Sequence, residues 1–371
     1  MTSQKIKFGL VGCGRISSRH IAALAAFREN AVLTCVCDLI ADRAAIKAAE
    51  YIREASCRGK GSIMKPRIYL NLDDMLENED IDVLSICTPS GLHPIHGIKA
   101  AGKHIHVLTE KPMGIDLPSA DKLIKACEEN EVRLFVMMQN RLNSTVRLLK
   151  RSMDKGRFGR IHMLLSNVLW QRPQSYYDQA PWRGTWEMDG GAFCNQAIHY
   201  VDMLQWLGGP VETAAALTGT LGRQIEAEDT GSAVIRYKSG AIGSLNVTML
   251  TFPRNVEGSI SVLGEKGTVK IGGMALNRIE KWEFETSDDD DLLAAESCYE
   301  PADVYGYGHT AYYSNVLDVL GGKAEPCADG PEGRKSLELV CAIYRSAREG
   351  EVVFLPDDSI NHIDSSIYMT R

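Results

Sequence analysis

The chain of 371 residues is long enough for two domains, and its 44% hydrophobic and 24% charged residues are typical of a folded protein with sizeable cores. A formal net charge of −7 makes a nucleic-acid-binding role unfavourable, because phosphate recognition needs a basic surface. The N-terminal sequence MTSQKIKFGLVG has no basic region followed by a long apolar core, and no stretch approaches 18 uncharged apolar residues. We therefore expect neither a secretory signal nor a transmembrane helix.

The ten cysteines are scattered along the chain, and no CxxC pair suggests a zinc or redox centre. Cys35, Cys37 and Cys87 fall inside apolar, strand-like runs, where cysteine behaves as a small buried hydrophobe. His93 and His96 have the spacing of a metal-binding pair, but no carboxylate or cysteine is suitably placed beside them. We expect a reduced, cytoplasmic protein without a bound metal.

The first 140 residues alternate strand and helix patterns. Apolar runs predict strands at 5–12, 31–38, 81–89, 104–112 and 132–140, and helical periodicity predicts helices at 15–27, 39–52, 92–103 and 117–131. Apolar strands that alternate with helices are typical of an α/β fold with a doubly wound parallel sheet. The basic stretch 53–67 lacks clear periodicity and is interpreted as an inserted loop.

The pattern changes after residue 140. We expect a helix over 143–159, long alternating runs at 160–170, 231–250 and 258–271, a late helix at 336–349 and a short strand at 351–356. The Ser-Gly and Glu-Lys-Gly segments between these runs are typical of hairpin turns. The chain is therefore expected to divide into residues 1–140, the α/β domain, and 141–371, an α+β domain with a large open, mostly antiparallel sheet.

The segment GLVGCGRIS places Gly12 and Gly14 where the first expected strand turns into a helix. The first glycine permits the tight turn, and the second lets the backbone approach a pyrophosphate. The helix N-terminus, which begins near Arg15 and Ile16, then supplies amides and positive dipole to the phosphates. This context predicts a dinucleotide-binding domain.

Asp38 stands at the end of the second expected strand, 24 residues after Gly14. An acidic residue there accepts hydrogen bonds from the adenosine ribose and repels a 2′-phosphate. The sequence therefore predicts NAD in preference to NADP.

Together with CTPSGLHPIHGIKAAGKHIHVLTEKP (87–112) and GGAFCNQAIHYVD (190–202), these motifs make the chain resemble the Gfo/Idh/MocA oxidoreductase family over essentially its whole length. In that family the lysine of EKP reaches the nicotinamide and the reacting hydroxyl, which implies this role for Lys111. The second family motif has a glycine triplet, an Asp and a His four positions later; here it reads Gly-Gly-Ala, Asn195 and His199. The change from Asp to Asn removes a carboxylate and places the acid/base role more heavily on His199.

The resemblance also implies a set of residues around the cofactor, beyond the glycine turn and Asp38: Thr88, Pro89, Ser90, His93, Glu110, Lys111, Gln139, Trp182 and Arg183.

Several stretches, among them RPQSYYDQAPWRGTWEMDGG (172–191) and VYGYGHTAYY (304–313), resemble the members that oxidise C3 of UDP-N-acetyl-glucosaminuronic acid for bacterial surface polysaccharide such as O-antigen. This subgroup implies a UDP-sugar acid as substrate. Its pyrophosphate and carboxylate need cations, and guanidinium groups can bind either with two hydrogen bonds. The expected contacts, besides Lys111, Asn195 and His199, are Arg141, Arg172 and Arg254 as cations and Asn143, Tyr177 and His309 as neutral partners.

Oxidation of a secondary alcohol requires a base for the hydroxyl proton, and an imidazole near its ordinary pKa suits that role. The hypothesis is that His199 is the base and Lys111 stabilises the developing alkoxide. The opposite assignment, with Lys111 as base, stays open, as does a purely structural role for a helix histidine. Asn195, four residues before His199, is expected one helical turn away on the same face, where it would orient a sugar hydroxyl.

Two other functions remain open from the sequence: a dehydrogenase of a free polyol such as inositol, and a glycoside hydrolase that retains its NAD. Subgroup members differ in whether NADH is released or recycled with 2-oxoglutarate, and the sequence does not distinguish these. Family precedent and the open sheet suggest a homotetramer.

Overall fold

The computed structural model describes residues 5–59, 62–301 and 306–356. The chain forms two compact units. Unit 1 consists of residues 1–114, 118–139 and 309–333, and unit 2 of residues 115–117, 140–308 and 334–371. The segment 309–333 therefore belongs with the N-terminal residues, although it lies far beyond the domain boundary expected at residue 140. Each unit is described by itself.

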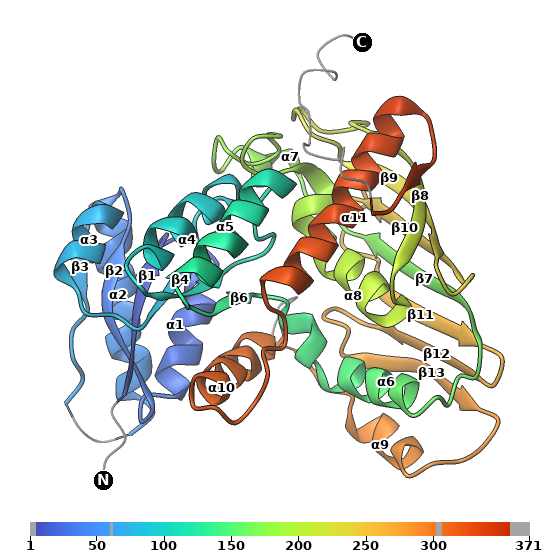
Figure 1. Ribbon diagram of the computed structural model, residues 1–371, viewed down its shortest axis with the longest axis horizontal. Helices are drawn as coiled ribbons and strands as arrows, with labels where there is room; N and C mark the ends of the chain where they lie inside the picture. The colour runs from blue at the N-terminus through green and yellow to red at the C-terminus, as the bar shows by residue number, and fades with distance from the viewer. Residues whose placement is uncertain (1–4, 60–61, 302–305, 357–371) are drawn as a thin grey trace. The chain divides into compact units, whose positions relative to one another are not determined.

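Unit 1 contains a six-stranded parallel sheet with the order β3-β2-β1-β4-β5-β6 (Figure 1). Its strands are β1 (Ile6–Val11), β2 (Ala31–Cys37), β3 (Arg67–Tyr69), β4 (Val83–Ile86), β5 (His106–Thr109) and β6 (Leu134–Val136). Its helices are α1 (Ser17–Ala26), α2 (Ala41–Ser56), α3 (Leu72–Asn78), α4 (His93–Ala101), α5 (Leu117–Glu129) and α10 (Gly308–Leu320). The strand order reverses between β1 and β4, and ligands of doubly wound folds bind at this point. The expected α/β class is confirmed.

The segment 309–333 contacts strand β6 of unit 1. The Tyr312 hydroxyl lies 2.5 Å from the carbonyl oxygen of Val136 and 2.9 Å from that of Ala328, and its single hydrogen is shared between these two acceptors. Phe135 also forms an isolated antiparallel bridge with Asp329. The sequence patterns gave no sign of this return.

One expectation for unit 1 was wrong in part. The stretch 53–67 was expected to be a loop, but α2 continues through Ser56. The reason is that Ala55 extends the buried stripe of Ala44, Ala48 and Tyr51 by another helical turn. The connection to β3 thus starts at residue 57, and its residues 60–61 lie outside the described part of the chain.

Unit 2 contains an eight-stranded sheet with the order β13-β12-β11-β7-β10-β9-β8-β14, antiparallel except for the pair β7 and β10. The strands are β7 (Ile161–Leu169), β8 (Val211–Gly219), β9 (Thr230–Tyr237), β10 (Ile242–Thr248), β11 (Glu257–Gly264), β12 (Gly267–Gly272), β13 (Arg278–Phe284) and β14 (Val353–Phe354). The helices are α6 (Ser144–Asp154), α7 (Gln174–Tyr177), α8 (Ile198–Gly208), α9 (Asp290–Glu296) and α11 (Gly330–Glu349). A mostly antiparallel second sheet was expected, and it is confirmed.

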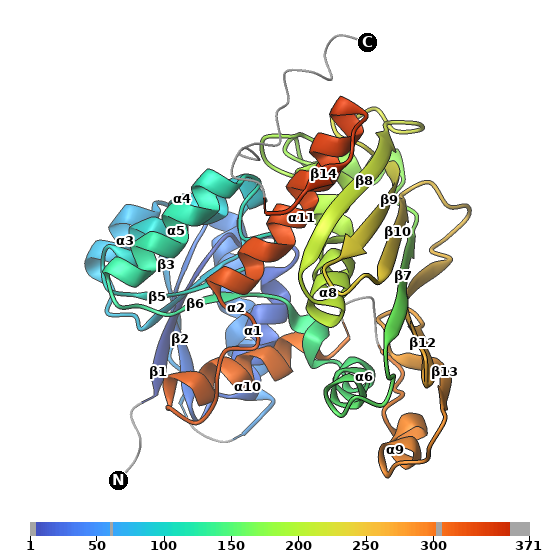
Figure 2. The ribbon, with the colours of Figure 1, turned by 45° about the vertical axis from the view of Figure 1, so that its right-hand side comes forward.

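The two faces of this sheet differ in environment (Figure 2). One face is covered by α8, which packs on β7 and β10, and by α11, whose Ser346 hydroxyl accepts a hydrogen bond from the Ala216 amide of β8. Along β9 and β10, side chains of the other face alternate with the buried ones and are exposed or half-buried. Among the described helices, none is both long and apolar enough to cross a membrane.

Candidate active site

The glycine-rich turn joins β1 to α1 in unit 1. Gly12 has φ +89°, and a Cβ atom there would lie 2.6 Å from the Cys87 carbonyl carbon. A Cβ at Gly14 would meet no atom within 4 Å, so the backbone at Gly14 can be approached by a ligand. The Ser17 hydroxyl donates to the Gly14 carbonyl at 2.6 Å, which closes the turn onto the first residue of α1. Arg15 is exposed and Ile16 is half-buried at this helix N-terminus.

Asp38 follows β2 directly, and its carboxylate connects the strand end to the glycine turn. One oxygen accepts a hydrogen bond from the Cys13 amide at 2.8 Å, and the other accepts one from the Ile40 amide at 2.9 Å. Asp38 is half-buried, so its outer edge stays accessible. An acidic residue at the end of the second strand of such a fold can accept hydrogen bonds from the ribose of a dinucleotide.

We expect Asp38→Asn to lower the discrimination between NADH and NADPH about tenfold or more, because it removes the charge that repels a 2′-phosphate and weakens the bonds to a ribose. The dissociation constants of both cofactors, measured by fluorescence titration, test this. Asp42→Asn, at an exposed position in the first turn of α2, is the matched control. An unchanged ratio of the two constants in Asp38→Asn would contradict the role of Asp38.

His93 connects the end of β4 with the segment that carries Lys111. Its ring nitrogens lie 2.7 Å from the Pro112 carbonyl oxygen and 2.8 Å from the Thr88 carbonyl oxygen. Burial lowers the pKa of His93, which favours a neutral ring. The sequence predicted that His93 lines the cofactor cleft; in the structure both its ring nitrogens face backbone carbonyls. Pro89 and Ser90 follow Thr88, and Ser90 is buried.

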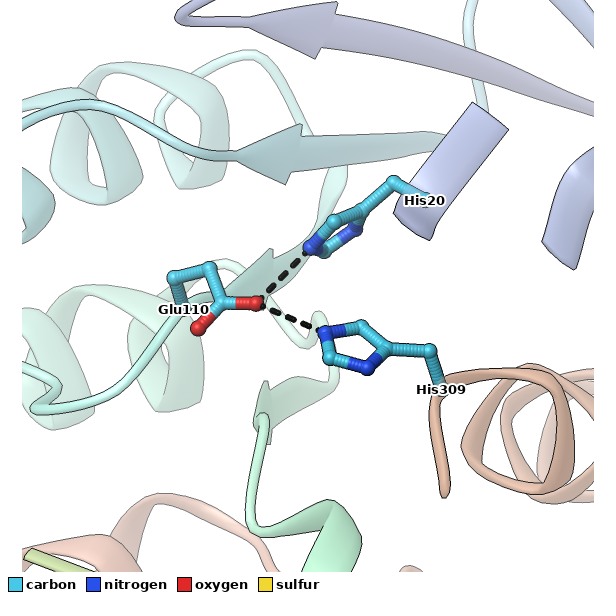
Figure 3. A group of neighbouring side chains, drawn as sticks. All are labelled: His20, Glu110 and His309. Carbon is cyan, nitrogen blue, oxygen red and sulfur yellow. Dashed lines mark hydrogen bonds and ion pairs between the residues drawn. The ribbon is translucent and has the colours of Figure 1, made fainter. Parts of the chain in front are cut away.

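Glu110 lies at the end of β5, next to Lys111, within a buried cluster of side chains (Figure 3). Its Oε1 atom is 2.9 Å from His20 Nε2 and 3.2 Å from His309 Nε2. His20 Nδ1 lies 2.9 Å from the Tyr313 hydroxyl, which is 2.8 Å from the hydroxyl of Ser85. One set of proton positions is consistent with this chain: Ser85 donates to Tyr313, Tyr313 to His20, and both histidines to Glu110.

The charge of Glu110 is stabilised by these contacts. Burial by itself raises the pKa of Glu110, but the hydrogen bonds from His20 and His309 outweigh it and hold the pKa well below its usual range. The Lys111 amide also donates to Glu110 Oε2 at 3.2 Å. Two histidines and a glutamate can also hold a divalent metal. Since the contacts have hydrogen-bond distances, we assign a hydrogen-bonded carboxylate.

Glu110→Gln is expected to lower the free energy of unfolding at pH 7 by about 2–3 kcal/mol, because charge-assisted hydrogen bonds from buried groups are lost. The lowered pKa of Glu110 contributes stability above the ordinary carboxyl pKa, and this stability is lost as the pH falls through the lowered value. The difference between wild type and variant should therefore shrink in acid. Urea unfolding at pH 7 and pH 3 measures it. The exposed Glu129→Gln on α5 is the control, and an equal effect of both variants would contradict the cluster's contribution.

In unit 2 a sharp turn precedes α8. Gly190 and Gly191 have φ +80° and +83°, and residues 192–196 form a π-helical turn. A Cβ at Gly191 would lie 1.8 Å from an oxygen of Glu228, so only glycine fits. His199 is the second residue of α8 and is buried with 8% exposure. Asn195 lies in the π-helical turn, so it and His199 are not neighbours on one continuous α-helix, as had been expected.

Asn195 is held by neighbours that the sequence analysis missed. Its amide donates to a carboxylate oxygen of Asp189, and its carbonyl oxygen accepts from the Gln196 amide at 3.2 Å. Asp189 is buried and also accepts from the Gly184 amide at 2.7 Å. The carboxylate missing from position 195 is thus present six positions earlier. No spacing rule connects Asp189 to the family motif, so the sequence carried no signal for it.

The predicted substrate residues divide into buried and accessible groups. Arg141 donates to both oxygens of Asp202 at 2.8 and 2.6 Å, and Ser336 also donates to Asp202. Asn143 is buried and donates to the Ala275 carbonyl at 2.9 Å. Both side chains therefore serve contacts inside unit 2. His309 belongs to the Glu110 cluster in unit 1.

The other predicted residues of unit 2 lie near Tyr176. Arg172 donates to Gln196 at 3.0 Å, and its guanidinium lies 5.5 Å from the centre of the Tyr176 ring. The Arg183 guanidinium lies 4.1 Å from the same ring centre and donates to the Tyr176 carbonyl. Trp182 is half-buried and Tyr177 is buried, whereas Arg254 is exposed. In unit 1, Gln139 is buried at the first turn after β6.

Comparison with known proteins decides the family. Residues 6–138 match the description "Oxidoreductase family, NAD-binding Rossmann fold", and residues 150–355 match "Oxidoreductase family, C-terminal alpha/beta domain". The chain belongs to the Gfo/Idh/MocA oxidoreductase family. The predicted cofactor NAD and the predicted oxidoreductase class are thereby confirmed.

Two solved structures are similar to this chain over nearly its whole length. The WlbA dehydrogenase from Bordetella pertussis, in complex with NADH and UDP-GlcNAcA, is 51% identical, with 96% of this chain and 100% of that chain covered and a TM-score of 0.90. The WlbA dehydrogenase from Chromobacterium violaceum, in complex with the same two molecules, is 47% identical, with 96% and 98% covered and a TM-score of 0.87. A myo-inositol 2-dehydrogenase of Thermotoga maritima is 23% identical over 95% of this chain and 99% of its own length.

Proposed function

We propose that this protein catalyses the NAD-dependent oxidation of the C3 hydroxyl of UDP-N-acetyl-glucosaminuronic acid to the 3-keto sugar. The observation that carries the proposal is the 51% identity, over 96% of the chain, to a dehydrogenase in complex with NADH and UDP-GlcNAcA. Inositol and apiose dehydrogenases share only 23–25% identity with the chain. A sugar-nucleotide substrate is therefore favoured over a free polyol.

The residues of unit 1 fit NAD. The open backbone at Gly14 and the α1 N-terminus receive the pyrophosphate, and Asp38 receives the adenosine ribose. Thr88, Pro89, Ser90, His93, Glu110 and Gln139 of unit 1 are proposed to shape the nicotinamide end. Trp182 and Arg183 of unit 2 are proposed as further cofactor contacts. When bound, NAD accepts a hydride from the sugar.

We assign proton transfer to His199 and electrostatic stabilisation to Lys111. The imidazole of His199 takes the C3 hydroxyl proton, and the Lys111 ammonium donates a hydrogen bond to the same oxygen as negative charge develops on it. Asn195, fixed by Asp189 and Gln196, orients a sugar hydroxyl. Arg141 has a supporting role in this proposal: its ion pair with Asp202 anchors α8 three residues beyond His199.

For the anionic groups of the substrate we propose Arg172 and Arg254, with Tyr177 as a neutral contact. Arg172 donates a hydrogen bond to Gln196, the residue after Asn195. The proposed anion-binding guanidinium is therefore held by the same turn that holds Asn195. Arg254 is exposed in the connection between β10 and β11 and can reach a ligand without breaking an internal ion pair.

Absorbance at 340 nm, recorded with excess NAD and UDP-GlcNAcA in the presence and absence of 2-oxoglutarate, tests the proposed function. Mass spectrometry should show the loss of two mass units from the sugar, with NADH formed or 2-oxoglutarate consumed. The second outcome would show that 2-oxoglutarate recycles the cofactor. Unchanged sugar nucleotide in both conditions would overturn the proposal, and turnover of inositol or release of a monosaccharide from a glycoside would replace it.

We place the reaction in the cytoplasm, within the synthesis of bacterial surface polysaccharide such as lipopolysaccharide. All ten cysteines lie within the described residues and are free thiols, which suits a reducing compartment. The sugar-nucleotide class of the proposed substrate supports the pathway.

The open face of the unit 2 sheet is proposed as the contact between subunits of a homotetramer. Four apolar side chains on neighbouring strands are exposed on this face, and their burial would stabilise an assembly: Met163, Leu217, Val234 and Ile242. Light scattering after gel filtration should give four times the mass of 40.9 kDa. Val234→Glu should dissociate the assembly, and a monomeric wild type would refute it.

A further inference from the structure

A buried carboxyl group lies under the turn that carries Asn195. Glu228 has 2% exposure, and one of its oxygens occupies the space that a side chain at Gly191 would fill. Its other oxygen, Oε1, accepts a hydrogen bond from the Phe193 amide at 2.8 Å and lies 2.8 Å from the Tyr344 hydroxyl of α11. Glu228 thus contacts Phe193 directly and is connected to the Gly190 carbonyl through Tyr344.

The Tyr344 hydroxyl has two acceptors for one hydrogen. It lies 2.5 Å from the Gly190 carbonyl oxygen and 2.8 Å from Glu228 Oε1, and it accepts a hydrogen bond from the Cys194 amide. A phenol donates one hydrogen bond, so it satisfies only one of these two oxygens. The contacts are consistent if Glu228 carries a proton and donates to Tyr344, while Tyr344 donates to Gly190.

The surroundings of Glu228 also favour the neutral form. Its Oε2 atom has no hydrogen-bond partner among the described residues, so ionisation would leave a buried oxygen poorly solvated. Backbone amides of Ala192, Phe193 and Glu228 itself lower the pKa of this carboxyl group, but burial outweighs them. The titratable groups near it are Tyr344 from α11 and Cys194 from the π-helical turn. Burial raises the pKa of Tyr344, so the phenol is neutral, and in the part of the chain that the structure describes no cation contributes to the pKa of Glu228. Asp229, the next residue, turns away and accepts three amides of residues 221–223.

We propose that Glu228 is a positioning residue that acts as a neutral carboxylic acid. Glu228 donates a hydrogen bond to the Tyr344 hydroxyl, which in turn donates one to the Gly190 carbonyl. These two bonds hold the turn that presents Asn195 to the sugar. Loss of the proton leaves two acceptors facing one hydroxyl and releases the turn. The consequence for sugar binding rests on the proposed function, whereas the protonation of Glu228 does not.

The first test is thermal unfolding between pH 5 and pH 9. Burial raises the pKa of Glu228 to about 8. The contribution of the protonated group to stability is therefore complete below the ordinary carboxyl pKa and is lost as the pH rises from there to about 8. The Tm of the wild type should fall by about 5–10 °C relative to that of Glu228→Gln over this range. Glu226→Gln, two positions earlier and exposed, should follow the wild type. Parallel curves for wild type and Glu228→Gln would overturn the proposal.

An infrared measurement keeps the proposal testable if Glu228→Gln does not fold. Difference spectra of the wild-type protein between pH 7 and pH 9 should show the loss of a protonated carboxyl band with a midpoint near pH 8. The absence of such a band would overturn the proposal without any variant.

The second test measures UDP-GlcNAcA binding by calorimetry with saturating NADH between pH 7.5 and pH 9. The dissociation constant of the wild type should rise about tenfold, and that of Glu228→Gln less than twofold, because the amide does not ionise. Equal rises in both proteins, with diverging Tm curves, would overturn the link to the Asn195 turn. If neither protein binds UDP-GlcNAcA at any pH, the proposed function fails, and the Tm curves still decide the state of Glu228.

Discussion

His199→Asn should lower kcat for UDP-GlcNAcA oxidation by about a thousandfold, while the dissociation constant of NADH stays within about twofold of the wild type. A positioned general base contributes roughly this much to a rate, and His199 belongs to unit 2, whereas the glycine turn and Asp38 belong to unit 1. Lys111→Met should cost a similar factor, because it removes the donor that stabilises the alkoxide. Single-turnover NADH formation and NADH fluorescence titration measure the two quantities.

A matched control is available in the same chain. His104 is exposed and has φ +58°, a backbone conformation that asparagine tolerates, so His104→Asn should leave both kcat and NADH binding unaffected. The pH dependence of kcat then separates the two candidate bases. If the acid limb disappears in Lys111→Met and persists in His199→Asn, lysine is the base and our assignment is reversed. Undiminished turnover in both single variants would refute both assignments.

Gly12→Ala should lower the stability of the protein, whereas Gly14→Ala should lower its affinity for NADH. A Cβ at Gly12 would lie 2.6–2.7 Å from backbone atoms of residues 87 and 88, at φ +89°, so this variant should lose about 3 kcal/mol or more of unfolding free energy. A Cβ at Gly14 meets no protein atom, so Gly14→Ala should unfold like the wild type. Its NADH dissociation constant should nevertheless rise about tenfold or more, since the methyl group occupies the space where the pyrophosphate approaches.

Urea unfolding and NADH titration of the same two preparations measure both effects. Wild-type affinity in Gly14→Ala would mean that the pyrophosphate does not approach the turn at this residue. Wild-type stability in Gly12→Ala would mean that the end of β4 can move to accept a side chain.

Features of the chain that depend on local periodicity were predictable from the sequence. The alternation of apolar strands and helices over residues 1–140 gave the parallel sheet, and Gly12, Gly14 and Asp38 lie at the turn and strand end where their spacing placed them. The helix stripe that continues to Ala55 was missed, because the basic residues of 53–67 concealed a single buried alanine.

Contacts between distant segments were not predictable. Glu110 is 90 positions from His20 and 199 positions from His309, so no motif relates them. Arg141 was expected to bind the substrate because the resembled subgroup acts on an anionic sugar nucleotide and arginine binds such anions. Its partner Asp202 lies 61 positions away, and only the fold brings the two together. Asp189 and Glu228 were missed for the same reason, since each acts through a contact with the π-helical turn of residues 192–196.

The return of residues 309–333 to unit 1 affects the order in which the chain can mature during synthesis. A nascent chain that has emerged only as far as residue 140 holds every strand of the parallel sheet but lacks Tyr312 at β6, and both His309 and Tyr313 beside His20. Until those residues leave the ribosome, the imidazole of His20 and the carboxylate of Glu110 are without two of their hydrogen-bonding neighbours. The domain that is translated first is therefore among the last to be completed, and a fragment ending near residue 140 would be a poor substitute for it.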